Sequence, residues 1–200
     1  ISAKQQLSTQ FDLDSSELFL NRELTWLEFN RRVLHEGQDS RTPLLERVFF
    51  LSVVGSNLDE FFMKRIGGLK QLVGAGVKKL SVDGRTPQEQ IYDCHIVVQD
   101  ILKQNQMLEE ELKTRLAEAG IVLMGYDQLT KEQKTFANNF FSDNVYPLLT
   151  PQGMDPAHPF PFISNLSLNL LVKVSYPNTE HAYLNRIKVP VDSGVSSLFI

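Results

Sequence analysis

The sequence predicts a mainly α-helical bundle followed by the beginning of an α+β domain. Up to about residue 120, apolar residues recur at intervals of three and four, which is the period of a helix that is buried along one face. Beyond residue 165 the period changes to two, which is typical of a β-strand. We therefore expect a loose polar arm over residues 1–16, a helical amino-terminal domain over 17–120 and a partial, truncated α+β domain over 121–200.

Composition and charge exclude several classes of protein. The 200 residues are 42% hydrophobic, which is enough to bury a core and argues against a disordered protein. The net charge of −4 argues against a protein that mainly binds nucleic acid. Cys94 is the only cysteine, which excludes an internal disulfide and favours a cytoplasmic location. No apolar run approaches the roughly 18 residues of a membrane-spanning helix, so we expect no transmembrane segment, while peripheral membrane association stays open.

The first helix is expected between Thr25 and Gly37. Thr25 and Glu28 have the spacing of a capping box, and glycine is common just after a helix. Asn30 lies in the middle of the apolar face of this helix. A polar side chain in such a place most often satisfies the backbone of a neighbouring turn, so we expect Asn30 to bond a backbone group rather than a ligand.

Two further helices are expected before residue 75. Thr42-Pro43 opens a short, almost wholly apolar helix that reaches Leu51 and should be the most buried element. The chain is then expected to break, and a new amphipathic helix should begin at Ser56 or Asn57, whose side chains are good N-caps. This helix should run to about Val73.

The helix from Ser56 is the one around which the helical domain is organised. Its apolar residues form one stripe along the helix, and at 100° per residue Arg65 falls inside this stripe. A guanidinium there needs an anionic ligand or a carboxylate, and Glu28 and Glu46 are the candidate partners. The stripe consists of Leu58, Phe61, Phe62, Ile66, Leu69, Leu72 and Val73.

Thr86-Pro87 repeats the combination of a cap and a proline, and predicts a helix to about Ala119 that is roughly 45 to 50 Å long. A short strand at 121–124 and a helix capped by Thr130 should follow. Two strands, at 166–174 and 182–189, should then pair across a turn at Pro177-Asn178. Because residues 197–200 look like an interrupted strand, we expect a piece of a longer enzyme.

Five segments resemble one protein family. Along about residues 17–175 the chain closely resembles the amino-terminal part of the polyphosphate kinases, of the large bacterial type that works through a phosphohistidine. The segments that carry the resemblance are NRELTWLEFNRRVL at 21–34, PLLER at 43–47, SNLDEFF at 56–62, YPLLTP at 146–151 and HPFPFISN at 158–165.

The resemblance implies a helical amino-terminal domain, a head domain used in dimer contacts, and two catalytic domains similar to phospholipase D outside this chain. The phosphorylated histidine and the Mg²⁺ ligands of the full-length enzyme lie in that missing part, so no catalytic and no metal-binding residue is expected here. Asn57 matches the asparagine of the family that contacts ATP near the base. The histidines that should therefore not be catalytic are His35, His95, His158 and His181.

Three residues are candidates for binding ATP. Asn57 is the first, although the residue pattern by itself is also explained by a helix cap. Lys64 is a weaker candidate on the same flank of the helix as Asn57 and Gly68, and a solvated lysine is its alternative. Arg65 is also weaker, because a structural ion pair would explain it. Some basic residues could border a polyanion, and a solvated charged face is their alternative: Arg31, Arg32, Lys78, Lys79 and Arg85.

The expected function is the reversible transfer of the terminal phosphoryl group of ATP to polyphosphate. This chain would supply one wall of the nucleotide pocket and oligomer contacts, and it should be inactive by itself. The expected partners are ATP, ADP, inorganic polyphosphate and, through the head domain, further copies of the chain in a homo-oligomer, with no nucleic acid. The alternative is a non-catalytic helical scaffold or dimerisation module without a ligand.

Overall fold

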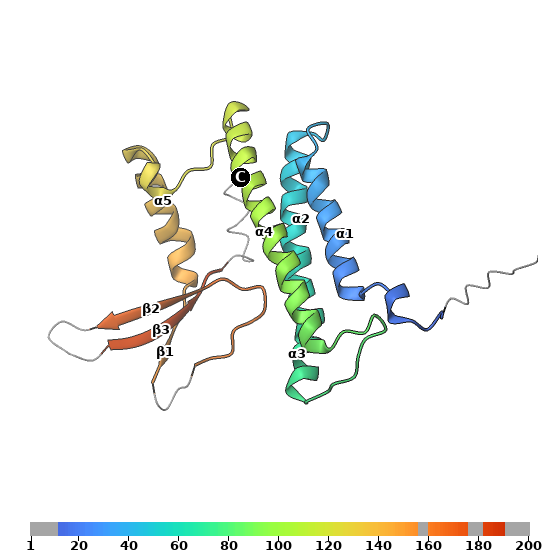
Figure 1. Ribbon diagram of the computed structural model, residues 1–200. Helices are drawn as coiled ribbons and strands as arrows, with labels where there is room; N and C mark the ends of the chain where they lie inside the picture. The colour runs from blue at the N-terminus through green and yellow to red at the C-terminus, as the bar shows by residue number, and fades with distance from the viewer. Residues whose placement is uncertain (1–11, 156–159, 176–181, 191–200) are drawn as a thin grey trace, which may run out of the picture. The chain divides into compact units, whose positions relative to one another are not determined.

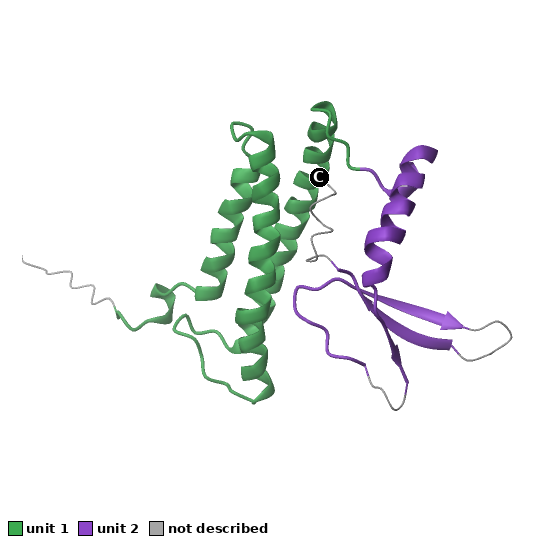
Figure 2. Ribbon diagram, turned by 180° about the vertical axis from the view of Figure 1, so that it is seen from behind, with its two compact units in different colours: residues 1–123 green, residues 124–200 purple. Residues whose placement is uncertain are grey.

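The computed structural model describes residues 12–155, 160–175 and 182–190. The chain divides into two compact units, residues 1–123 and 124–200, which are described separately (Figure 2). Several predicted features lie outside the described residues, namely most of the arm, the histidines His158 and His181, the turn at Pro177-Asn178 and the last strand at 197–200.

The first unit is helical. Its long helices are α1 (Arg22–Gln38), α2 (Leu44–Phe61) and α4 (Pro87–Glu118), and each of these three packs against the other two (Figure 1). A π-helical turn (Phe62–Ile66) joins α2 to α3 (Gly67–Gly74), which also packs on α4. The predicted bundle is therefore confirmed. In the described part of the chain no helix is long and apolar enough to cross a membrane.

The start of α1 differs from the prediction. The N-cap is Asn21, whose side chain accepts hydrogen bonds from the backbone of Glu23 and Leu24, so Thr25 lies inside the helix and does not cap it. The amide of Asn21 also donates to Asp83 (3.1 Å) and to Gln90 (3.1 Å). These long-range partners select Asn21, and they are invisible in the local sequence.

The predicted break before Ser56 is wrong, because α2 continues through Gly55 and Ser56 to Phe61. A glycine inside a helix costs about 1 kcal/mol relative to alanine, and the packing of α2 against α1 and α4 offsets this cost. Ser56 and Asn57 are therefore mid-helix residues and do not cap. Nor is α2 the most buried element, since Leu45 and Phe49 are 63% and 58% exposed.

The π-helical turn also corrects the position of Arg65. The buried residues of this face are spaced by four, three, five and three, and the step of five is the extra residue of the π turn. The extra residue places Ile66 rather than Arg65 on the buried face that contains Phe61. The side chain of Arg65 is left 40% exposed. Phe62, which was expected in the buried stripe, is 43% exposed. The buried residues in order are Val54, Leu58, Phe61, Ile66 and Leu69.

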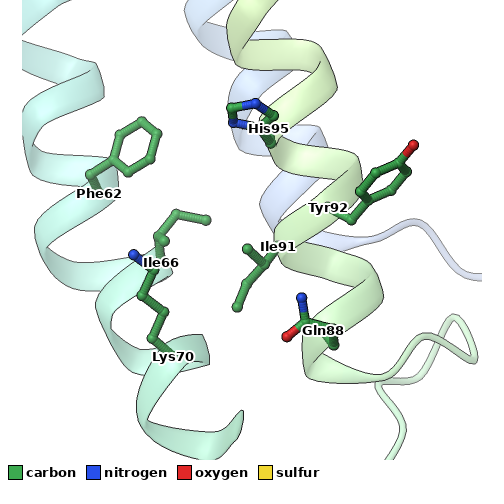
Figure 3. Close-up of a pocket in the computed structure, with 7 residues that line it drawn as sticks. All are labelled: Phe62, Ile66, Lys70, Gln88, Ile91, Tyr92 and His95. Atoms are coloured by element: carbon green, nitrogen blue, oxygen red, sulfur yellow. The ribbon is translucent and has the colours of Figure 1, made fainter. Parts of the chain in front are cut away.

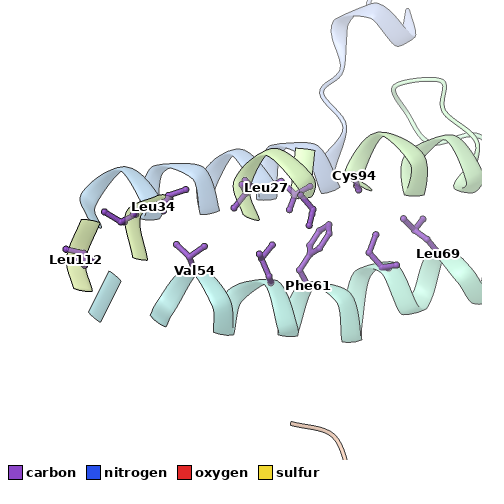
Figure 4. Packing of buried hydrophobic residues seen from close by; sticks show 12 residues of the cluster. Leu27, Leu34, Val54, Phe61, Leu69, Cys94 and Leu112 are labelled. Atoms are coloured by element: carbon purple, nitrogen blue, oxygen red, sulfur yellow. The ribbon is translucent and has the colours of Figure 1, made fainter. Parts of the chain in front are cut away.

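The helix α4 agrees with its prediction. Thr86 and Glu89 form a capping box, Pro87 occupies the first turn, and the helix has 32 residues, or about 48 Å. Its buried side chains meet those of α1 and α2 in one core (Figure 4). The fully buried members of this core are Leu27, Leu34, Val54, Phe61, Cys94, Ile101 and Leu112.

The described part of the second unit contains the helix α5 and a small sheet. Thr130 caps α5 (Lys131–Phe140) as predicted. The antiparallel sheet has the order β1 (Pro151–Met154), β3 (Ala182–Lys188) and β2 (Asn169–Ser175). This bears out the predicted α+β beginning.

Two predicted strand positions need correction. The strand predicted at 166–174 begins later, at Asn169, because Leu166 has a left-handed backbone (φ 53°) that does not fit a strand. Residues 121–124 form no strand. Leu123 is 68% exposed, so these apolar residues have no sheet face to cover.

Candidate functional site

The three predicted ATP-binding residues line one cavity. It has a volume of about 340 Å³ and lies where α1 faces the end of α2 and the π-helical turn. Asn57 is supplied by α2, and Lys64 and Arg65 by the π turn. Gly68, which was expected on the same flank, is not among the lining residues. The complete lining is Trp26, Phe29, Asn57, Glu60, Phe61, Lys64 and Arg65.

One wall of the cavity is aromatic. Trp26 stacks on Phe61 with 4.9 Å between ring centroids and 15° between ring planes. Phe29 lies one turn further along α1, 6.4 Å from Trp26, and is 46% exposed. Because Phe61 is only 1% exposed, it anchors the wall in the core and leaves Trp26 and Phe29 as the accessible rings. The Arg32 guanidinium lies over the Phe29 ring, 5.8 Å from its centroid. Such rings can stack on a planar ligand.

The side chain of Asn57 is held by a second asparagine. Asn57 Nδ2 donates to Asn30 Oδ1 (2.9 Å), and Asn30 Nδ2 donates to the backbone carbonyl of Val54 (3.3 Å). Asn30 is completely buried. The predicted backbone bond of Asn30 is therefore confirmed, and Asn30 also supports the leading site residue.

Lys64 forms an ion pair with Glu60, one turn earlier on the same side of the helix. The hydrogen bond and the positive charge of Lys64 lower the pKa of Glu60. Both side chains are more than half exposed, so the pair is open to water and can be exchanged for a ligand at little cost.

Arg65 is paired with a carboxylate, as predicted, but the partner is Glu23 rather than Glu28 or Glu46. Arg65 Nε lies 3.8 Å from Glu23 Oε2. Glu23 is 2% exposed, and its Oε2 accepts no hydrogen bond from a described residue. Glu28 instead pairs with Arg31 at 3.3 Å. The pair with Glu23 thus fixes one side of the Arg65 guanidinium at the edge of the cavity.

Two of the other basic residues are neutralised within the protein. Arg31 pairs with Glu28 and Asp100, and Arg85 pairs with Asp83 and Asp93. These interactions favour a structural role for both residues over a path for a polyanion.

A second cavity of about 260 Å³ lies beside the first unit's helices α3 and α4. Figure 3 shows that Phe62, Ile66 and Lys70 come from one helix, and that Gln88, Ile91, Tyr92 and His95 come from the other. None of the predicted site residues lines it. It therefore remains separate from the candidate site.

Sequence reasoning missed four residues of the site, namely Glu23, Trp26, Phe29 and the supporting Asn30. Trp26 and Phe29 are one helical turn apart, and this aromatic pair was the available signal. The roles of Glu23 and Asn30 depend on contacts with residues 42 and 27 positions away, respectively, so no local signal exists. Among the described residues, no three His, Cys, Asp or Glu side chains are grouped so that they could hold a metal ion.

Comparison with known proteins identifies the family. A family model described as the polyphosphate kinase N-terminal domain matches residues 19–124, and one described as the polyphosphate kinase middle domain matches residues 132–196. The chain is 51% identical over 180 residues to a polyphosphate kinase of Synechocystis sp., covering 90% of this chain and 25% of that protein. It is 43% identical over 173 residues to a polyphosphate kinase of Mycolicibacterium gilvum, covering 86% of this chain and 24% of that protein.

A solved structure gives the same result. The crystal structure of polyphosphate kinase from Porphyromonas gingivalis superposes with a TM-score of 0.71 at 25% identity, and covers 87% of this chain and 25% of that chain. The chain thus spans about a quarter of the length of the relatives that it matches. Since the first family model covers more than half of the residues, the chain belongs to the polyphosphate kinase family, as its amino-terminal part.

Proposed function

We propose that this chain is the amino-terminal and head region of an ATP-polyphosphate phosphotransferase and that its cavity forms one wall of the nucleotide pocket. The observation that carries the proposal is the convergence of Asn57, Lys64 and Arg65 on one cavity with an aromatic wall. A nucleotide needs this combination, because it has a planar base with polar edges and an anionic phosphate chain.

Each part of the lining fits one part of ATP. Trp26 and Phe29 offer faces for stacking of the base, and the amide of Asn57 offers a polar contact for its edge. Lys64 and Arg65 supply positive charge for phosphates. Glu60 counters this charge in the free protein, so an incoming phosphate would replace it as the partner of Lys64.

The chemical step belongs to the longer enzyme. The reaction would transfer the terminal phosphoryl group of ATP reversibly to polyphosphate through a phosphohistidine outside this chain. Mg²⁺ would be held there too, so the residues described here bind and orient the nucleotide but move no phosphoryl group. We place the enzyme in the cytoplasm and expect the head domain to mediate homo-oligomer contacts.

One observation favours the alternative of a non-catalytic scaffold. Leu45 and Phe49 lie one turn apart on α2 and are 63% and 58% exposed. An exposed apolar strip of this kind is suited to a protein contact. The scaffold reading differs from the nucleotide reading in one respect, since it assigns no ligand to Asn57.

The test is titration of ATP into the full-length enzyme and its Asn57→Ala variant. Loss of one net hydrogen bond should weaken ATP binding by about 2- to 10-fold. Gln106→Ala on the exposed side of α4 is the matched control and should leave the affinity unchanged. An Asn57→Ala enzyme that binds ATP as tightly as the wild type would remove Asn57 from the pocket and favour the scaffold.

A further inference from the structure

We infer that Asn30 is a positioning residue that sets the orientation of the Asn57 amide and thereby makes the cavity selective for a base that carries an N–H donor at its edge. This inference rests on the proposed function, and it adds the chemical group that the cavity recognises. The exocyclic amino group of adenine is such a donor.

The orientation begins at the backbone of α2. The carbonyl group of Val54 is buried and can only accept a hydrogen bond, and Asn30 Nδ2 lies 3.3 Å from its oxygen. An asparagine placed the other way round would set two oxygen atoms against each other. Asn30 must therefore present its amino group to Val54 and its Oδ1 in the other direction.

The next link follows from the first. Asn30 Oδ1 is 2.9 Å from Asn57 Nδ2. Because this oxygen can only accept, Asn57 must turn its amino group toward Asn30 and donate the hydrogen bond. Because Asn30 is completely buried, water cannot take the place of either partner. The two hydrogen bonds from Asn57 to Asn30 and from Asn30 to Val54 therefore run in one direction, and each bond fixes which end of the donating side-chain amide carries the nitrogen.

The last link is the free end of Asn57. No described residue donates a hydrogen bond to Asn57 Oδ1, and Asn57 is half-buried in the lining of the cavity. Its oxygen is thus the acceptor that remains for a ligand. An acceptor at this place favours a base with an N–H group and disfavours one that presents only a hydrogen atom on carbon or a carbonyl oxygen.

The experiment compares two nucleotides on the full-length enzyme. ATP and purine riboside 5′-triphosphate differ only at the 6-position of the base, where the second compound has hydrogen in place of the amino group. The measured quantity is the ratio of the two dissociation constants. This ratio does not depend on the folded fraction of the sample, so a loss of stability in a variant cannot imitate a loss of selectivity.

Wild-type enzyme should prefer ATP about 3- to 10-fold, the effect of one hydrogen bond. Asn57→Ala should bring the ratio near one. Asn57→Asp keeps an oxygen acceptor and should retain a preference for ATP, even though its charge weakens both nucleotides. Asn30→Leu removes the anchor and should lower the ratio toward one.

The outcomes separate the inference from the function on which it rests. If Asn57→Ala leaves ATP affinity unchanged, the proposed nucleotide pocket itself is wrong. If Asn57→Ala weakens both nucleotides equally and the wild type does not discriminate, the pocket stands and the inference falls. A wild-type ratio in Asn30→Leu overturns the positioning role. Should Asn30→Leu not fold, Asn57→Asp decides, because loss of the preference would show that nitrogen rather than oxygen faces the base.

Discussion

Replacing Arg65 with methionine tests how the edge of the cavity is built. Arg65 Nε is 3.8 Å from Glu23 Oε2, and Glu23 is 2% exposed, with no hydrogen bond from a described residue to that oxygen. Removing one partner of a fully buried ion pair costs about 3–5 kcal/mol. The loss should be smaller here, because Arg22 still bonds Glu23 Oε1 (3.0 Å) and because the side chain of Arg65 is 40% exposed, so that water screens the pair; we expect about 1–2 kcal/mol.

The two reciprocal variants sharpen this expectation. Glu23→Gln leaves an arginine that water can reach, so its cost should be smaller, about 0.5–1 kcal/mol. In the double variant no buried carboxylate is left without its partner, and the combined loss should be less than the sum of the single losses. Lys113→Met removes an exposed pair with Glu109 on α4 and serves as the control, with a loss below about 0.5 kcal/mol.

Urea unfolding followed by Trp26 fluorescence measures these losses. Trp26 is the only tryptophan of the chain and stacks on Phe61 beside the cavity, so its emission reports on the first unit. A loss below about 0.5 kcal/mol for Arg65→Met, which is the usual range of a surface substitution, would refute the reasoning. ATP titration of full-length Arg65→Met, corrected for the folded fraction, then separates the roles, because an unchanged affinity would leave Arg65 with the fold alone.

Two further predictions concern α4. Burial, together with the charges of Glu23 and Asp93, raises the pKa of the Cys94 thiol to about 12 from 9.0. Because the thiol ionises at a lower pH in the unfolded chain than in the folded one, the free energy of unfolding is highest below pH 9 and falls by about 1.4 kcal/mol per pH unit as the pH rises from 9 toward 12. Denaturant unfolding at pH 8 to 11 should show this slope in the wild type and a smaller slope in Cys94→Ala. Thr86→Ala removes the capping box and should lower the stability by about 1 kcal/mol, measured as a lower Tm. The control, Thr114→Ala on the exposed face of the same helix, should lower it less, and equal losses of stability would contradict a capping role.

Much of the helical part was predictable from local signals. Thr86 with Glu89 and Thr130 with Gln133 decide where α4 and α5 begin, because a cap satisfies backbone groups within one turn of itself. The strand pair of the second unit followed from alternation over a few residues. Asn57, Lys64 and Arg65 could be named from the sequence, and the structure brings them to one cavity, but their contact with ATP stays a prediction.

The errors occurred where distant residues decide the local structure. The turn from Phe61 to Ile66 holds one residue more than an α-helical period allows, which no rule of 100° per residue can anticipate. Likewise, Asn21 rather than Thr25 caps α1 because Asp83 and Gln90 hold it.

The sequence by itself determined the helical period, the two capping boxes and the family, since these depend on residues close together in the chain or on motifs in order. Only the tertiary structure decided that α2 continues through Gly55, that Glu23 pairs with Arg65, and that Asn30 orients Asn57. The physical reason is that a buried polar group takes the partner that the packed helices bring to it, and the identity of that partner is absent from the local sequence.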